Sequence, residues 1–205
     1  RHVPGVSVPL GGNSHWLVLV ELSSARADGG LGTVLENVLA TALERDLVGD
    51  ATLAANERQR LDLWAFREAL PEGQKPEGGS IKHDISVPIS RLAEFVAAAN
   101  EAVEQALPGI RPVTFGHMGD GNLHYNLSQP AGADTDAFLA ETPRLGAIVH
   151  DLVASMGGSI SAEHGVGLLK RDEIARRKSP VEMDLMRALK KPLDPRGLMN
   201  PGKII

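Results

Sequence analysis

The sequence contains no cysteine, and this absence removes two kinds of site. Disulfides and thiolate metal sites both need cysteine, so any bound metal would be held by histidine, aspartate or glutamate. The same absence is compatible with a reducing compartment, and we expect the protein to be cytoplasmic.

Long apolar runs and an excess of positive charge are also missing. No stretch approaches the roughly 20 apolar residues that a membrane-spanning helix needs, and the first residues, RHVPGVSVPLGG, lack the regions of a signal peptide. The formal net charge of −5 gives no support to nucleic-acid binding, which usually shows as a basic stripe. We therefore expect neither a membrane span nor a nucleic-acid partner.

Glycine-rich phosphate-binding motifs are the most informative absence. The chain has no G-x-G-x-x-G after a strand and no P-loop, so nothing in it would wrap a dinucleotide. Its 205 residues, with an apolar share of 42%, can nevertheless bury the core of one large domain or two small subdomains.

What is present is an alternation of predicted strands and helices. One pair of strands is joined by a tight hairpin, so a wholly parallel sheet is excluded in favour of an α+β domain, with an antiparallel sheet covered on one face by helices. The β-α-β rhythm occurs twice and predicts two ferredoxin-like halves. The predicted strands are 16–24, 51–55, 81–88, the two strands of the hairpin 112–127, and 159–167. The predicted helices are 29–48, Asn56 to Pro71, one that begins at a Ser90 cap, Pro143 to Gly157, 168–178, and one that begins at a capping box at Ser179. A loop is predicted at 71–80.

Residues 115–127, with the sequence FGHMGDGNLHYNL, hold two histidines on either side of a turn. Gly119 and Gly121 allow positive φ angles, so they interrupt a straight strand between the histidines. A hairpin folded at this point would bring His117 and His124 opposite each other, with Cβ atoms about 5 Å apart. Two imidazoles at that distance can share one metal ion.

A second motif, SAEHGVG at residues 161–167, follows later in the chain. Glu163 would add a carboxylate to the two histidines and complete a site with open coordination positions, suited to Zn, Mn or Fe(II). His164 would remain free to act as a base, since an imidazole titrates near neutral pH. The alternative is a glycine-rich hairpin with ordinary surface histidines, which explains either histidine alone better than it explains both motifs together.

Three separated motifs carry a resemblance to a known family. They are GHMGDGNLHYN from Gly116, SAEHGVGLLKRD from Ser161 and LDPRGLMNPGKI from Leu193. Together they resemble the C-terminal domain of FAD-linked oxidases, the family of D-lactate dehydrogenases, glycolate oxidase subunits and D-2-hydroxyglutarate dehydrogenases. The resemblance covers the whole chain, residues 1–205. It implies that an FAD-binding domain precedes these residues in a longer protein.

The resemblance also implies roles for individual residues. In similar enzymes the metal is most often zinc, and the base is the histidine after the ligand glutamate, here His164. Arg67 and Lys82 match an arginine and a lysine that bind substrate carboxylate, and Asn126 matches a further substrate contact. Asn200 matches a residue near the flavin. From sequence alone, Arg67 and Lys82 would be surface charges and Asn200 a turn former.

One position departs from the family pattern. In relatives that oxidise 2-hydroxyglutarate, a hydroxyl residue is expected four places after the arginine, and this chain has Pro71 there. The departure weakens the expected contact with a second substrate carboxylate.

These motifs favour the substrate and metal part of an FAD-dependent dehydrogenase that oxidises a D-2-hydroxy acid to the 2-oxo acid, with hydride passing to the flavin. Its partners would be a small 2-hydroxy acid and an electron acceptor; the sequence leaves the exact acid, the acceptor and a homodimeric state open. A metal-dependent hydrolase is the main alternative, because zinc held by two histidines and a glutamate also activates water, although the chain has no H-E-x-x-H helix. A non-catalytic binding or dimerisation module is the third.

Overall fold

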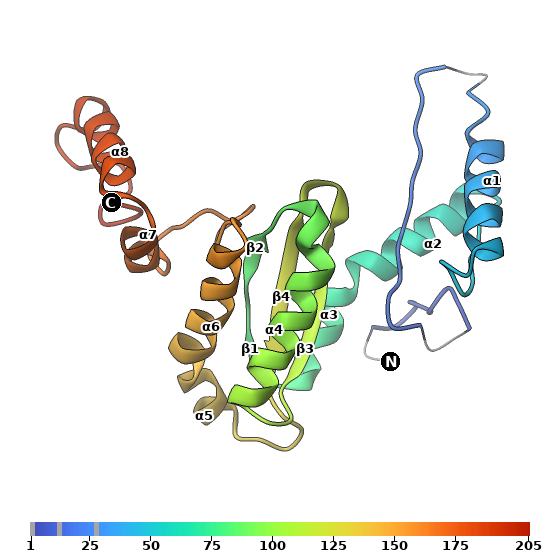
Figure 1. Cartoon of the computed structure of the whole chain (residues 1–205), viewed down its shortest axis with the longest axis horizontal. Helices are drawn as coiled ribbons and strands as arrows, with labels where there is room; N and C mark the ends of the chain where they lie inside the picture. Colours follow the sequence, from blue (N-terminus) through green and yellow to red (C-terminus); the bar gives the residue numbers. More distant parts are fainter. Residues whose placement is uncertain (1–2, 12–13, 27–28) are drawn as a thin grey trace. The chain divides into compact units, whose positions relative to one another are not determined.

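The chain divides into two compact units, Arg1–Pro76 and Glu77–Ile205, whose elements are labelled in Figure 1. The structure is a computed structural model, and it describes residues 3–11, 14–26 and 29–205. Within these ranges, no helix combines the length and the apolar character that crossing a membrane requires.

The first unit is helical. Asn56, where the sequence predicts a helix to begin, caps the second helix of this unit, because its side-chain oxygen accepts the backbone N–H of Gln59 at 3.0 Å. The predicted helix at 29–48 is confirmed over a shorter range. The helices of this unit are α1 (Leu31–Glu44), α2 (Glu57–Glu68) and α3 (Leu70–Gln74).

Two predicted strands of the first unit, 16–24 and 51–55, are wrong, because neither stretch joins a β-ladder. A run of leucine and β-branched residues indicates side chains suited to a sheet, but a strand also needs a hydrogen-bonding neighbour. In 16–24 the apolar side chains stay largely exposed, with Trp16 at 61% and Val18 at 67%. The first predicted ferredoxin-like half therefore has no sheet among the described residues.

The predicted loop at 71–80 is wrong in its first half. Helix α2 ends at Glu68, before Pro71, and Pro71 lies in the first turn of α3. Proline is accepted there because the first helical residues have no intrahelical use for a backbone N–H. A short 3₁₀ helix, Lys75–Glu77, follows α3.

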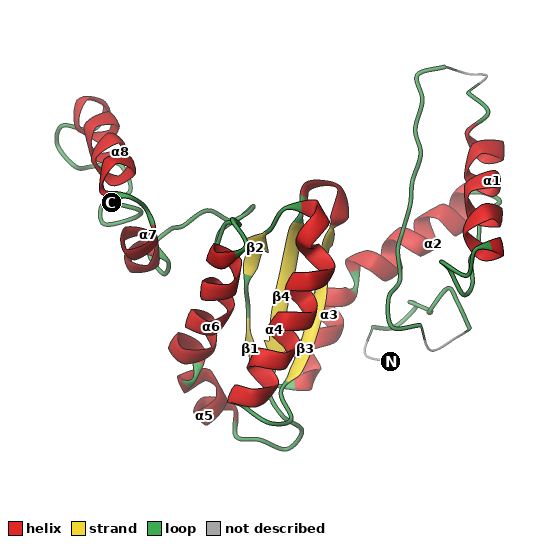
Figure 2. Cartoon of the chain, in the orientation of Figure 1, coloured by secondary structure: helices red, strands yellow, loops and turns green. Residues whose placement is uncertain are grey.

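The second unit is built on a four-stranded antiparallel sheet, drawn in yellow in Figure 2. Its β4 pairs with β3 on one side and with the short strands β1 and β2 on the other. The backbone N–H of Tyr125 donates to the carbonyl of His83 at 2.9 Å, so β1 and β2 behave as one strand with a break at Lys82 and His83. The strands are β1 (Ser80–Ile81), β2 (Asp84–Ser86), β3 (Arg111–His117) and β4 (Asn122–Ser128).

The order of segments across this sheet is ferredoxin-like. An isolated bridge joins Ser86 to Ser159, so the order is Ser159, β2, β4 and β3. With one helix connecting β2 to β3 and another leading from β4 to Ser159, the connectivity is β-α-β-β-α-β. This confirms the predicted α+β class. The predicted strand at 159–167 is wrong beyond the bridge, because residues 161–167 form a loop in which Gly165 has a φ of 73°.

Helices α4 and α6 lie along the sheet of the second unit in Figure 1 and pack against each other. The ring of Phe95 on α4 meets Tyr125 on β4 edge-on, with centroids 5.5 Å apart. The predicted Ser90 cap is wrong, because Ile89–Arg91 forms a 3₁₀ turn before α4, whereas the capping box at Ser179 is confirmed. The helices of this unit are α4 (Leu92–Ala106), α5 (Thr135–Ala140), α6 (Thr142–Ser155), α7 (Arg171–Arg177) and α8 (Pro180–Leu193), with a further 3₁₀ turn at Met118–Asp120.

Strand alternation gives β4 one apolar face and one polar face. Leu123, Tyr125 and Leu127 belong to the buried hydrophobic core. The residues between and beside them are Asn122, His124 and Asn126, which therefore point to the other face of the sheet. This polar face carries the predicted histidines.

Candidate active site

The β3–β4 hairpin places the two predicted histidines on one face of the sheet, although not opposite each other. The register pairs His117 with Asn122 and Phe115 with His124, so the histidines are diagonal neighbours. The predicted pairing leaves residues 118–123 between the two histidines, whereas the observed turn spans only 118–121, includes the 3₁₀ helix Met118–Asp120 and shifts the register by two. Diagonal neighbours are about 7–8 Å apart, so a third group is needed to connect them.

Glu163 is that third group. Its Oε1 lies 3.6 Å from Nδ1 of His117, and its Oε2 lies 3.7 Å from Nε2 of His124. These separations are longer than good hydrogen bonds. They are close to the distance of about 3.4 Å that separates two ligand atoms bound at about 2.1 Å to a tetrahedral zinc ion. The donor types suit a divalent cation, but Glu163 approaches each histidine through a different oxygen, and these three residues do not form a compact group of ligand atoms.

A more compact group of possible ligands includes Asp84, a residue that the sequence motifs did not indicate. Among the described residues, one candidate ligand atom each from Asp84, His124 and His164 lies within 4.8 Å of the other two. Asp84 is the Cα partner of His124 on β2 and is 4% exposed. Asp84 lies inside the predicted strand 81–88, where a charged residue is unusual, and this was the sequence feature that could have indicated it. The predicted ligands His117, His124 and Glu163 are less compactly arranged than this group, since Glu163 approaches the two histidines through different oxygens.

His164 lies beside this group and remains open to solvent. Its ring stacks on that of His124, with centroids 5.5 Å apart and an angle of 27° between the planes. The ring of Phe115 lies 5.0 Å from His124. Nδ1 of His164 is 3.6 Å from Oδ2 of Asp84, and its side chain is 66% exposed. An exposed imidazole next to possible metal ligands could exchange a proton with a bound molecule.

Asp84 is a buried carboxylate with two backbone donors. Its Oδ2 accepts the N–H of Glu163 at 2.9 Å and the N–H of His164 at 2.8 Å. Burial raises the pKa of Asp84, but these hydrogen bonds and the nearby charges of His164 and Lys170 outweigh it, so the pKa lies below the usual range. The carboxylate is therefore ionised at neutral pH.

The predicted substrate residues are distributed over both units. Asn126 is buried on the same face of β4 as His124, two residues further along, and Lys82 is exposed at the break between β1 and β2. Arg67 lies on α2 of the first unit. Asn200 follows α8 in an exposed turn, where its φ is 49°.

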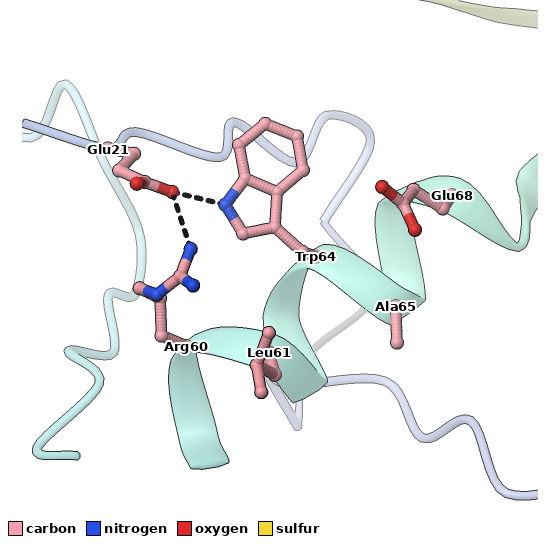
Figure 3. Close-up of a pocket in the computed structure, with 6 residues that line it drawn as sticks. All are labelled: Glu21, Arg60, Leu61, Trp64, Ala65 and Glu68. Atoms are coloured by element: carbon pink, nitrogen blue, oxygen red, sulfur yellow. Dashed lines mark hydrogen bonds and ion pairs between the residues drawn. The ribbon is translucent and has the colours of Figure 1, made fainter. Parts of the chain in front are cut away.

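A cavity of about 620 Å³ in the first unit has a different character (Figure 3). Glu21 accepts hydrogen bonds from the indole N–H of Trp64 and, at 3.3 Å, from Nη1 of Arg60. Its lining contains none of the predicted site residues and no histidine, so it offers no metal ligand set like that of the second unit. The cavity is lined by Glu21, Arg60, Leu61, Trp64, Ala65 and Glu68.

The fold and the histidine-containing motifs define an α+β domain with a candidate metal site on one sheet face, and comparison with known proteins shows its family. The chain belongs to the family of FAD linked oxidases, C-terminal domain, whose sequence model matches residues 4–204. The resemblance found in the motifs is thereby confirmed.

Several curated relatives share one printed name. A D-2-hydroxyglutarate dehydrogenase of Stutzerimonas stutzeri is 39% identical over 172 residues, which cover 82% of this chain and 37% of that protein. The mitochondrial D-2-hydroxyglutarate dehydrogenase of Bos taurus is 37% identical over 98% of this chain and 35% of its own length. The Arabidopsis thaliana mitochondrial protein is 33% identical over 100% of this chain and 35% of its own length. The chain thus spans about a third of the length of the curated relatives it matches.

Proposed function

We propose that this chain is the substrate- and metal-binding part of an FAD-dependent dehydrogenase that oxidises a D-2-hydroxy acid to the 2-oxo acid. Family membership and the names of the relatives support the reaction class. The observation that carries the proposal is the position of Glu163 between His117 and His124, with His164 beside them. Most of the FAD-binding surface is proposed to lie outside these 205 residues, because they contain no phosphate cradle.

His117, His124 and Glu163 are the proposed ligands of a divalent cation, with zinc as the proposed metal. Asn200 is the proposed contact with the flavin. Bound FAD would supply the hydride acceptor, and the bound cation would supply Lewis acidity toward the substrate oxygens.

His164 is the proposed base for the substrate hydroxyl. Its Nδ1 faces Asp84, so Nε2 is the atom left to accept the hydroxyl proton. Lys82 offers a point charge and Arg67 a planar pair of donors for substrate carboxylate, and the Asn126 amide offers a polar contact on the same face as His124.

The identity of the acid depends on two opposing observations. The relatives are named for 2-hydroxyglutarate, which has two carboxylates. Pro71 stands where a hydroxyl residue is expected to help bind the second carboxylate, and it lies in the first turn of α3. We therefore propose a D-2-hydroxy acid as the substrate class, with an electron acceptor outside this chain and a cytoplasmic location.

The test uses the purified full-length protein and three acids: D-2-hydroxyglutarate, D-lactate and glycolate. At least one acid should bleach the yellow flavin absorbance. His164→Ala should keep flavin and metal but lower kcat by about 100-fold or more, with a smaller change in KM, because proton removal occurs in the transition state. His124→Ala should lose metal by elemental analysis. His15→Ala, which changes an exposed histidine of the first unit, is the control and should behave like the parent.

Each part of the proposal has its own contradicting result. A full-length protein without flavin, or with flavin that none of the acids reduces, contradicts the reaction class. A kcat near the parent value in His164→Ala contradicts the role of His164 as the base. Loss of metal in that variant would show that His164 is a ligand. Unchanged metal content in His124→Ala refutes the ligand assignment.

A further inference from the structure

Asp84 has no role in the proposed reaction, yet it is the most buried ionised group at the site. It is 4% exposed, stands directly across the ladder from His124, and belongs to β2, a different strand from either histidine. A buried carboxylate carries a large desolvation cost unless hydrogen bonds compensate it. The compensating donors therefore indicate what this charge does.

Those donors are two consecutive backbone N–H groups. Oδ2 of Asp84 accepts from Glu163 at 2.9 Å and from His164 at 2.8 Å, and it lies 3.6 Å from Nδ1 of the His164 ring. Successive N–H groups that converge on one anion require a bent backbone. In a regular strand, the side chains of adjacent residues would point to opposite faces. The bend lets Glu163 reach both histidines while His164 stacks on His124.

The same loop is tied down at its start by Lys170. Its half-buried ammonium group donates to the carbonyl of Ile160 at 2.7 Å and lies 3.5 Å from the carbonyl of Asp84. The backbone N–H of Ala162 also donates to the Asp84 carbonyl, at 3.3 Å. The loop is thus attached to β2 and its surroundings through this backbone bond, through the Asp84 carboxylate and through Lys170. Oδ1 of Asp84 is buried and makes no hydrogen bond within the described part of the chain, so the carboxylate acts on the loop through Oδ2.

We propose that Asp84 is a positioning residue, which holds the backbone of Glu163 and His164 so that a ligand side chain and a base side chain face one site. The inference rests on the proposed function and adds a residue to it. Asp84 acts through the two residues and does not contact the metal or the substrate. The competing assignment is direct metal ligation, because Asp84 also lies within the compact group with His124 and His164.

The experiment compares Asp84→Ala and Asp84→Asn in the full-length protein. Asparagine keeps a side-chain oxygen that can accept the two N–H groups, whereas alanine removes it. Ser86→Ala is the matched control, since Ser86 is the next residue on the same face of β2. Two readouts are used: amide hydrogen exchange of Glu163 and His164 by NMR or mass spectrometry, and affinity for Zn²⁺ alone by competition with a chelating dye.

We expect Asp84→Ala to speed exchange at Glu163 and His164 by about tenfold or more while the amide of Tyr125 stays protected. Zn²⁺ affinity should fall about 10- to 100-fold, as for other residues that orient metal ligands. Asp84→Asn should give intermediate values for both readouts, because a neutral acceptor makes weaker hydrogen bonds than a carboxylate. Ser86→Ala should match the parent.

Three results would overturn the proposal. The first is parent-like exchange at Glu163 and His164 in Asp84→Ala. The second is an Asp84→Asn variant that keeps the amides protected but loses Zn²⁺ as fully as alanine does, which makes Asp84 a ligand. The third applies if Asp84→Ala does not fold: Asp84→Asn then shows the same amide exchange at Glu163 and His164 and the same Zn²⁺ affinity as the parent. Neither readout uses flavin or turnover, so failure of the proposed reaction would leave this test interpretable.

Discussion

At the scale of single residues, the second unit keeps a neutral histidine in its interior. His83 is 3% exposed, and its Nδ1 lies 2.9 Å from the carbonyl oxygen of Tyr125. A carbonyl only accepts, so Nδ1 carries the proton of a neutral ring. Burial above all, with the charges of His150 and Lys170, lowers the pKa of His83 to about 4 against the opposing effect of this hydrogen bond.

This histidine makes the stability of the fold depend on pH. The unfolded chain takes up the His83 proton below its ordinary pKa of 6.5, whereas the folded chain resists until about pH 4. The unfolded state therefore binds more protons between these values, and stability falls as the pH falls through this window. Between pH 7.5 and pH 5, this one group should remove about 2 kcal/mol from the free energy of unfolding.

Urea unfolding of the parent and of His83→Asn at pH 7.5, 6 and 5 measures this effect. Asparagine does not titrate, and its amide N–H can replace Nδ1 as a donor to Tyr125. The variant should lose about 2 kcal/mol less than the parent over this range, since the other titrating groups contribute equally to both. Equal pH dependence in the two proteins would show that His83 does not carry the effect.

Residue by residue, the site was predictable where its members belong to local motifs. His117 and His124 lie in one glycine-containing motif and Glu163 and His164 in another, about forty residues later, and the family resemblance groups the two motifs. Asp84 could not be found in this way, because its contacts depend on a ladder between β2 and β4 and on a loop far along the chain. A charged residue in a predicted strand marks Asp84 as unusual, but nothing local in the sequence indicates which distant residues it contacts.

At the scale of elements, the predicted helices and strands that the structure confirms include those whose apolar residues are buried. In α4, the helix predicted after Ser90, the buried residues recur at the spacing of one helical face, so helical periodicity and packing agree; they are Leu92, Phe95, Val96, Ala99 and Val103. The stretch at 16–24 has equally suitable residues but no ladder, since strand formation depends on a neighbour that composition cannot supply. The hairpin was predictable from its turn residues, whereas its register depended on how many residues the turn takes up, and residues 118–121 form it.

The turn of this hairpin tolerates a side chain at one glycine and not at the other. Gly121 has a φ of 74°, and a Cβ there would lie 2.1 Å from the carbonyl oxygen of Val87, whereas a Cβ on Gly119 would meet nothing within 4 Å. Gly121→Ala should therefore lower the free energy of unfolding by about 2 kcal/mol or more. Gly119→Ala should change it by less than about 0.5 kcal/mol. Urea unfolding measures both, and equal effects would contradict the geometry of the turn.

At the scale of the whole molecule, the hydrophobic core belongs to the second unit. The buried core residues that the structure describes run from Ile81 to Met183. Helices α1 and α2 of the first unit contain no buried residue. Cooperative stability requires a shared core, so the two units should differ in how they unfold.

We expect residues 77–205, produced without the first unit, to unfold in one cooperative transition on heating. Residues 1–76 alone should lose helical signal gradually, because their helices have little buried surface to hold them together. Far-UV circular dichroism of both fragments provides the comparison. A gradual transition for residues 77–205, or a sharp one for residues 1–76, would place the cooperative core elsewhere.

The donors around His124 come from three separate stretches of chain: β2, the β3–β4 hairpin and the loop after α6. They meet only when the sheet has closed and α6 has returned the chain to Ser86, so the unfolded chain has no equivalent binding group. A ligand that bridges them binds the folded state alone, and at 100 times its Kd it adds about 2.7 kcal/mol to stability. Shortage of that ligand in a cell would therefore reduce the amount of folded protein, through chaperone and protease clearance, together with its activity.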